Sequence, residues 1–242
     1  MSSFAQPARA LLDPFDALGA AVEARRWVAP LLLLVLSVCA SGTAFALRWN
    51  AASSVVQGLQ MSGQLERMSE SEIADEIQTS TRKALVGGIA KGVFVMPLLA
   101  VLLAALLWFC AWLFETPAPF GRLLSVAALA LLPIALYHLI FAVCALAQHE
   151  LSLERMGELV PSSLAVLDGL SPRLKRVLGA VDFFNLWTVL LLGLGFAAAT
   201  GMRRGRALLL SGVLYLMYSG VFMVGLPALM MMRGAGGGGG SR

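Results

Sequence analysis

Charge is what this sequence lacks most. Only 13% of its 242 residues are Asp, Glu, Lys or Arg, whereas a soluble domain carries about 25%. Hydrophobic residues make up 59% of the chain, and its mean hydropathy is +0.81. We therefore expect a chain that resides in a bilayer, where each crossing segment satisfies its own backbone hydrogen bonds as a helix. The net charge of +4 is modest and the basic residues are scattered, which excludes nucleic acid as an expected partner.

Residue types that build metal, redox and catalytic sites are scarce as well. The three cysteines, Cys39, Cys110 and Cys144, lie in apolar runs, where cysteine behaves as a small hydrophobic residue. The two histidines have no second ligand type at metal-site spacing, and there is no CxxC pair. The sequence also lacks a GxSxG serine, an HExxH pair and paired intramembrane aspartates. We predict no catalytic residue, no metal, no cofactor and no enzymatic activity.

Long apolar runs, in contrast, are abundant. A bilayer core needs about 20 apolar residues in helical form. The sequence predicts an all-α, polytopic membrane protein with five transmembrane helices plus short amphipathic interfacial helices. The predicted spans are 27–47, 93–114, 123–147, 181–201 and 207–231. Pro97, Pro133 and Pro227 fall within these spans, where proline kinks or breaks a helix.

The two ends of the chain differ from the membrane domain. Residues 1–26 predict an amphipathic segment, because Asp13 suits a helix N-cap and Pro14 suits the first helical position. Such a helix would lie on the membrane surface before the first span; the alternative is a frayed polar lead-in. Residues 232–242 predict a flexible Gly-rich tail, either natural or added.

The connections between the spans are unequal in length. The long segment 48–92 contains Ser69 and Glu72 at the spacing of a capping box, which marks a helix start. Short links, "ETPAPFGR" and "MRRGR", predict that the second span packs with the third and the fourth with the fifth. Basic residues number seven on the side of the N-terminus and eleven on the other side, so charge counts alone leave the orientation open.

Polar residues inside the spans are few, and an ionisable residue there is a candidate functional site. The candidate intramembrane polar cluster consists of His138, Asp182, Asn185, Tyr215 and Tyr218. One interpretation is structural: Asp182 and Asn185 accept hydrogen bonds at a helix start, where the helix dipole favours a carboxylate, and His138 bonds to a tyrosine or a backbone carbonyl. The other is that the cluster lines a ligand or transport path.

Small residues mark a candidate helix-packing face in the fourth span. Gly193, Ala197 and Gly201 are spaced four apart, which lets helix backbones approach closely. The neighbouring helix on this face belongs either to the same chain or to a partner.

The stretch "VDFFNLWTVLLLGLGFAAATGMRRGRA", together with the span count and the two short links, resembles the Yip domain family (Ypt/Rab-interacting membrane proteins) in its bacterial branch. The resemblance implies a cytoplasmic N-terminus and a multi-pass protein of the bacterial inner membrane. Eukaryotic members are similar to scaffolds that recruit small GTPases, but this sequence lacks their long polar N-terminal region, so a GTPase partner is not carried over. The residues on the family's recurring positions are Asp182, Phe184, Trp187, Gly193, Arg204 and Ala207.

Two functions are consistent with these observations. The leading prediction is a non-enzymatic membrane scaffold or accessory subunit that binds another membrane protein, such as export or trafficking machinery, or a second copy of itself. The alternative is a small transporter or channel component with a polar cavity formed by spans three to five. The alternative requires the five residues of the polar cluster to line one cavity.

Overall fold

The computed structural model describes residues 14–163 and 181–221, with isolated positions between 165 and 179. Every regular element in this part of the chain is helical, which confirms the all-α fold class. Isolated bridges join Trp49 to Leu151 and Ser163 to Asp182. The helices are α2 (Pro14–Glu23), α3 (Val28–Arg48), α4 (Ala51–Met61), η1 (Leu65–Arg67), α5 (Glu70–Ala90), η2 (Lys91–Val95), α6 (Met96–Leu113), α7 (Phe120–Ala130), α8 (Leu132–Ala147), η3 (Glu154–Glu158), α10 (Phe183–Thr200) and α11 (Arg204–Tyr218).

The chain is a multi-pass membrane protein. Four helices of the described part are long and apolar enough to cross a bilayer, namely Val28–Arg48, Glu70–Leu113, Phe120–Ala147 and Phe183–Thr200. The fifth predicted span, 207–231, begins inside α11, and its residues 222–231 lie outside the described part of the chain, as does the predicted tail. A count of five therefore stays a prediction. The N-terminal helix α2 begins at Pro14, the predicted first helical position, and Asp13 also lies outside the described residues.

The predicted second span, 93–114, is the C-terminal part of a much longer helix. Ser69 caps this helix: its hydroxyl accepts from the Glu72 amide, while the Glu72 carboxylate accepts from the Ser69 amide, which is the predicted capping box. The helix then continues through α5, the π-helical η2 and α6. The π turn directly precedes Pro97, whose missing N–H and bulky ring disturb the regular hydrogen-bond ladder.

Proline also divides the third span. Helix α7 ends at Ala130 and α8 begins at Leu132, so the single predicted span 123–147 consists of two helices. The break falls two residues before Pro133, where a proline disfavours helical backbone and cannot donate to the preceding turn.

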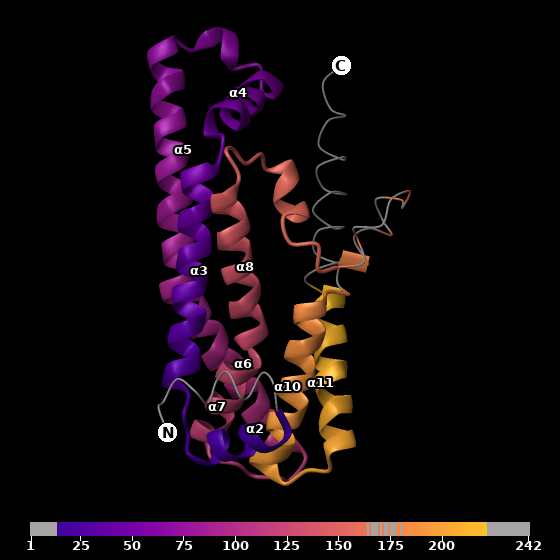
Figure 1. Ribbon diagram of the computed structural model, residues 1–242. Coiled ribbons are helices and arrows are strands. Elements are labelled where there is room, and N and C mark those ends of the chain that lie inside the picture. The colour runs from indigo at the N-terminus through magenta and orange to yellow at the C-terminus, as the bar shows by residue number, and fades with distance from the viewer. Residues whose placement is uncertain are drawn as a thin grey trace.

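The helices form one bundle with two unlike ends (Figure 1). Helix α2 lies across one end, beside the short links that follow α6 and α10, and it packs on α7 and α10. The two short links join helices that pack together, α6 with α7 and α10 with α11, as their lengths predict. At the opposite end, α4 and the first half of α5 form a hairpin that rises beyond α8.

Helices α3 and α5 meet without intervening side chains. A Cβ atom added at Gly88 would stand 2.7 Å from the Cα of Gly42, so the two backbones are in direct contact. One turn further on, a Cβ atom at Gly92 would lie 2.4 Å from the Cys39 Sγ. This glycine seam fixes the long helix against α3 at the point where α5 passes into η2.

Candidate functional site

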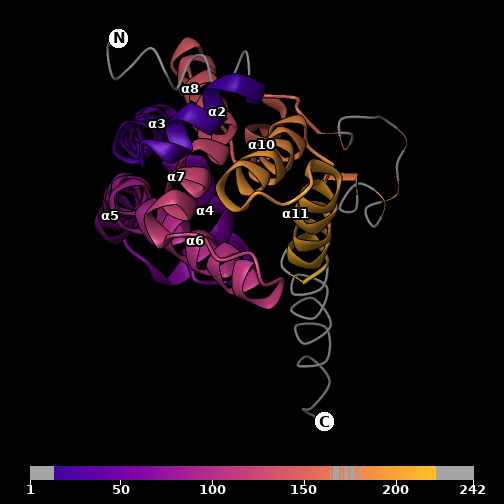
Figure 2. The same cartoon turned by 90° about the horizontal axis from the view of Figure 1, so that it is seen from below.

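A cavity of about 440 Å³ lies between α6 and α11, with α8 and α10 behind it. Viewed along the bundle, α11 packs on α10, whereas α6 packs on α7 (Figure 2). Four of the five residues in the predicted polar cluster line this cavity: His138 from α8, Asn185 from α10, and Tyr215 and Tyr218 from α11. Residues up to 80 positions apart in the sequence therefore share one site.

Asp182, the fifth member of the cluster, does not line the cavity and instead begins α10. Its carboxylate accepts a hydrogen bond from the backbone amide of Asn185 at 3.0 Å. The hydroxyl of Ser162 donates to its other oxygen, and Ser163 is paired with it through the backbone. These contacts are those of an N-cap, and they also tie the preceding connection to the start of α10.

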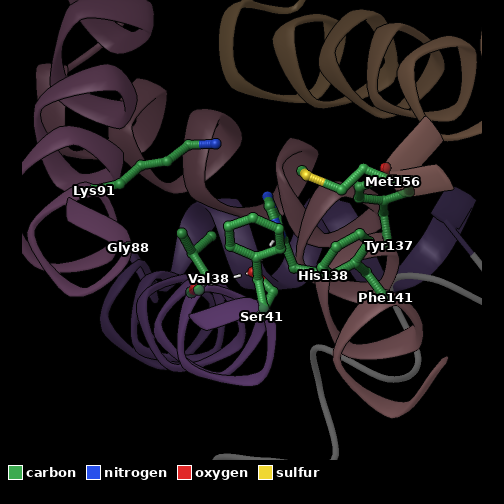
Figure 3. Close-up of a pocket in the computed structure, with 10 residues that line it drawn as sticks. Val38, Ser41, Gly88, Lys91, Tyr137, His138, Phe141 and Met156 are labelled. Atoms are coloured by element: carbon green, nitrogen blue, oxygen red, sulfur yellow. Dashed lines mark hydrogen bonds between the residues drawn. The ribbon is translucent and has the colours of Figure 1, made fainter. Parts of the chain in front are cut away.

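His138 connects the main cavity to a second one of about 250 Å³ (Figure 3). Its Nδ1 lies 2.8 Å from the Ser41 hydroxyl of α3, and that hydroxyl lies 2.9 Å from the Val38 carbonyl. A hydroxyl has one proton, so when Ser41 donates to Val38 the imidazole donates from Nδ1. The Nε2 atom of this tautomer is then an acceptor.

Lys91 is the residue at this site that sequence analysis missed. It lines both cavities, and its side chain extends from the π turn η2 toward the helix that carries Tyr137 and His138 (Figure 3). Of the lining residues in the described part of the chain, it is the one with a charged side chain. Lys91 comes two residues before an apolar run, so the sequence predicts that it lies in a loop. The structure instead places it within a continuous helix, where it lines the cavities.

The cavity is graded from polar to apolar along the bundle axis. Helices α8 and α11 run antiparallel to α6 and α10 (Figure 1), so the later residues of one pair lie level with the earlier residues of the other. The polar end is formed by Lys91, His138, Asn185, Thr188, Tyr215 and Tyr218. The apolar end is lined mainly by Leu99, Leu102, Leu103, Leu106, Leu131 and Leu192.

One polar residue lies toward the apolar end, and its hydrogen bond is already made. The Ser211 hydroxyl is buried and donates to the Leu208 carbonyl in its own helix at 3.0 Å. The Thr188 hydroxyl at the polar end differs, because it is buried without a hydrogen-bond partner in the described part of the chain. Unused hydrogen-bonding capacity is thus found at the polar end.

Of the predicted packing face of α10, Gly193 lies against α11. A Cβ atom at Gly193 would stand 2.9 Å from the Cα of Leu208 in α11, and Ala197 is buried. Gly201 has a different role: it has φ of +74°, ends α10 as a left-handed C-cap and has no atom within 4 Å of its Cβ position. Gly195, which lies on the same helix, approaches Val126 of α7 instead.

The lining of the main cavity combines polar and apolar groups. Within the described residues, no three His, Cys, Asp or Glu side chains are placed to hold a metal ion. The main cavity offers one cation, hydroxyl and amide groups, and an apolar wall. Such a lining suits an amphiphilic molecule with an acceptor-rich or anionic end.

The family model of the Yip1 domain matches residues 8–226, which is most of the chain. No curated protein and no solved structure matches the sequence. Because the family model covers nearly the whole bundle, the chain belongs to the Yip1 domain family.

Proposed function

We propose that this multi-pass membrane protein is a non-enzymatic accessory subunit that binds another membrane protein through the α4–α5 hairpin. The observation that carries this proposal is the hairpin itself, which rises beyond the neighbouring spans (Figure 1). The glycine seam between α3 and α5 holds its base, and the backbone bridge between Trp49 and Leu151 holds its entry. A hairpin anchored in this way presents a fixed surface, which lowers the entropic cost of binding.

The chemistry of the hairpin indicates the kind of partner. Its exposed acidic residues gather around the start of α5. The one ion pair given for the described residues, Lys83 with Glu76 at 4.0 Å, lies further along this helix. A partner with basic side chains would be complementary to this surface, and complementarity of this kind directs association and orientation. The exposed acidic residues are Glu66, Glu70, Glu72 and Asp75.

The same proposal places the end that carries α2 in the cytoplasm of a bacterial cell, with the protein in the inner membrane. The placement rests on the family resemblance and on the concentration of arginines in the short connections at that end, because the total counts of seven and eleven basic residues do not favour it. The hairpin then lies on the opposite side of the membrane, out of reach of a cytosolic GTPase. The arginines are Arg25, Arg26, Arg122, Arg203, Arg204 and Arg206.

A pull-down with charge-reversed hairpins tests this function. Full-length protein is purified in mild detergent as wild type, as the double variant Glu70→Lys/Asp75→Lys, and as the control Glu23→Lys/Glu115→Lys at the opposite end. We expect wild type and control to retain the same membrane protein and the hairpin variant to lose it. Recovery of the chain alone from all three preparations, or equal retention by all three, contradicts the proposal.

A small transporter or channel component is the second candidate, and one observation favours it. This function requires five polar residues in one cavity, and four of them, His138, Asn185, Tyr215 and Tyr218, line a single cavity inside the membrane domain. The fifth, Asp182, is the N-cap of α10 instead. It predicts solute or ion flux into vesicles that contain the purified protein, and a lower flux in the Asn185→Leu variant. A flux no greater than that of protein-free vesicles contradicts it.

A further inference from the structure

The main cavity has the form of a lipid site, with an anion-binding end and an acyl-chain end. We infer that it binds one acyl chain of an anionic phospholipid from the surrounding bilayer, with the phosphate at Lys91. This inference is independent of the hairpin and its partner. It concerns the residues of η2, α6, α8, α10 and α11 that line the cavity.

Charge complementarity selects an anion. Among the described residues that line the cavity, Lys91 is the one charged side chain and none is a carboxylate. The nearby carboxylate of Asp182 already accepts hydrogen bonds from the Ser162 hydroxyl and from the backbone amide of Asn185. A phosphate only accepts hydrogen bonds. The polar end supplies two further donors, the side-chain amide of Asn185 and the Thr188 hydroxyl, which has no partner in the described part of the chain.

The dimensions fit one chain of a lipid. The lining runs along the long helix from Lys91 to Leu106, which is about 22 Å at 1.5 Å per residue. One leaflet of the hydrocarbon core is about 15 Å thick, so the lining spans a head group and the acyl chain below it. The volume of about 440 Å³ also lies within the usual range of ligand cavities, about 300–1,000 Å³.

The route of entry lies between α6 and α11. Each packs on a different neighbour, α6 on α7 and α11 on α10 (Figure 2). Leu99, Leu102 and Leu106 line the cavity and are also partly exposed on the surface of the bundle. A lipid therefore enters sideways from the bilayer, with its phosphate already at the depth of the polar end.

Native mass spectrometry of the full chain with defined lipids tests the inference. The protein is purified, exchanged into detergent and mixed with equal amounts of phosphatidylglycerol and phosphatidylcholine. We expect one phosphatidylglycerol to be retained about tenfold over phosphatidylcholine, a preference that Lys91→Gln abolishes and Lys91→Arg keeps. A tenfold ratio corresponds to about 1.4 kcal/mol.

Two further variants distinguish binding in the cavity from a general effect of positive charge and from loss of folding. Lys83→Gln removes an exposed lysine of the same helix, one that is paired only with Glu76 at 4.0 Å, and keeps the preference. Leu103→Trp fills the apolar end and lowers retention of the lipid while Lys91 stays in place. Equal retention of the two lipids by wild type overturns the inference, and so does an unchanged preference in Lys91→Gln.

Discussion

The long helix of α5, η2 and α6 passes through two opposite environments within a few turns. Where it meets α3, glycine lies against glycine, and a Cβ atom at Gly42 would stand 2.6 Å from the Cα of Gly88. Where it faces α10 and α11, side chains stay apart and leave about 440 Å³. The comparison shows that close packing at Gly88 holds the next turn of the helix, which carries Lys91, at the edge of both cavities.

Replacing Gly88 by Ala is expected to break the glycine seam and to have the largest effect. The new methyl group would meet backbone atoms of Gly42, which cannot rotate away. We expect destabilisation of about 3 kcal/mol, the upper end of the usual cost of overpacking. Thermal unfolding in detergent measures it.

The adjacent glycine is a matched control for that substitution. Gly87 has no atom within 4 Å of its Cβ position, so Gly87→Ala is expected to leave stability unchanged or to raise it by up to about 1 kcal/mol. Equal losses of stability at Gly87 and Gly88 would mean that the seam does not exist.

Replacing Ser41 by Ala tests the link between the seam and the cavity. This substitution removes the hydroxyl that lies 2.8 Å from His138 Nδ1 and leaves the imidazole without that partner. We expect a loss of about 1–3 kcal/mol, the cost of a buried polar group left unpaired. Ser37→Ala is the control, because the Ser37 hydroxyl donates only to Leu34 of its own helix; unfolding curves that coincide for the two variants would refute the link.

Replacing Asp182 by Ala tests whether this residue acts as a helix cap rather than as a cavity residue. The start of α10 loses its N-cap and its contact with Ser162, which is expected to cost about 1 kcal/mol. Asp182→Asn retains the capping oxygen and most of the stability. If Asp182→Asn is as destabilised as Asp182→Ala in thermal unfolding, the carboxylate charge matters more than the cap.

The smallest expected effect is at the far end of α5, outside the predicted spans. Hydrogen bonds from the Ser69 amide and hydroxyl lower the pKa of Glu72 below its usual 4.5. A lowered carboxyl pKa means that the capping box stabilises the folded state above about pH 4.5, and that this contribution is lost as pH falls through the folded-state pKa. Hydrogen exchange of amides 70–74 is expected to show fraying in acid; a Glu72→Gln variant, with no carboxylate to titrate, should show no such change with pH.

Much of the fold was predictable because its signals are local. Apolar runs of about 20 residues identify spans, the Ser69–Glu72 spacing identifies a helix start, and short links identify paired helices. Gly42 and Gly88 are 46 residues apart in the sequence, so no local pattern reveals their contact. Gly201 shares the spacing of a packing residue, and only its positive φ distinguishes it as a cap.

The sequence predicted the uncharged polar residues of the site, but it did not predict the charged one, Lys91. Polar residues inside apolar runs are costly, and this drew attention to His138, Asn185 and the tyrosines. Lys91 lies just before an apolar run, where a lysine usually reaches the membrane interface. Its place in the cavity depends on the π turn and the glycine seam, which are tertiary features.

Cysteine labelling from water tests the central claim, that polar residues of separate spans line one cavity, most directly. Asn185→Cys and Leu190→Cys are compared on α10 in vesicles of phosphatidylcholine alone, after the three native cysteines are replaced by Ala. Leu190 is 41% exposed on the surface of the bundle, whereas Asn185 lines the cavity. We predict that a water-soluble thiol reagent labels the cysteine at 185 at least tenfold faster; equal rates, or faster labelling at 190, would contradict the account.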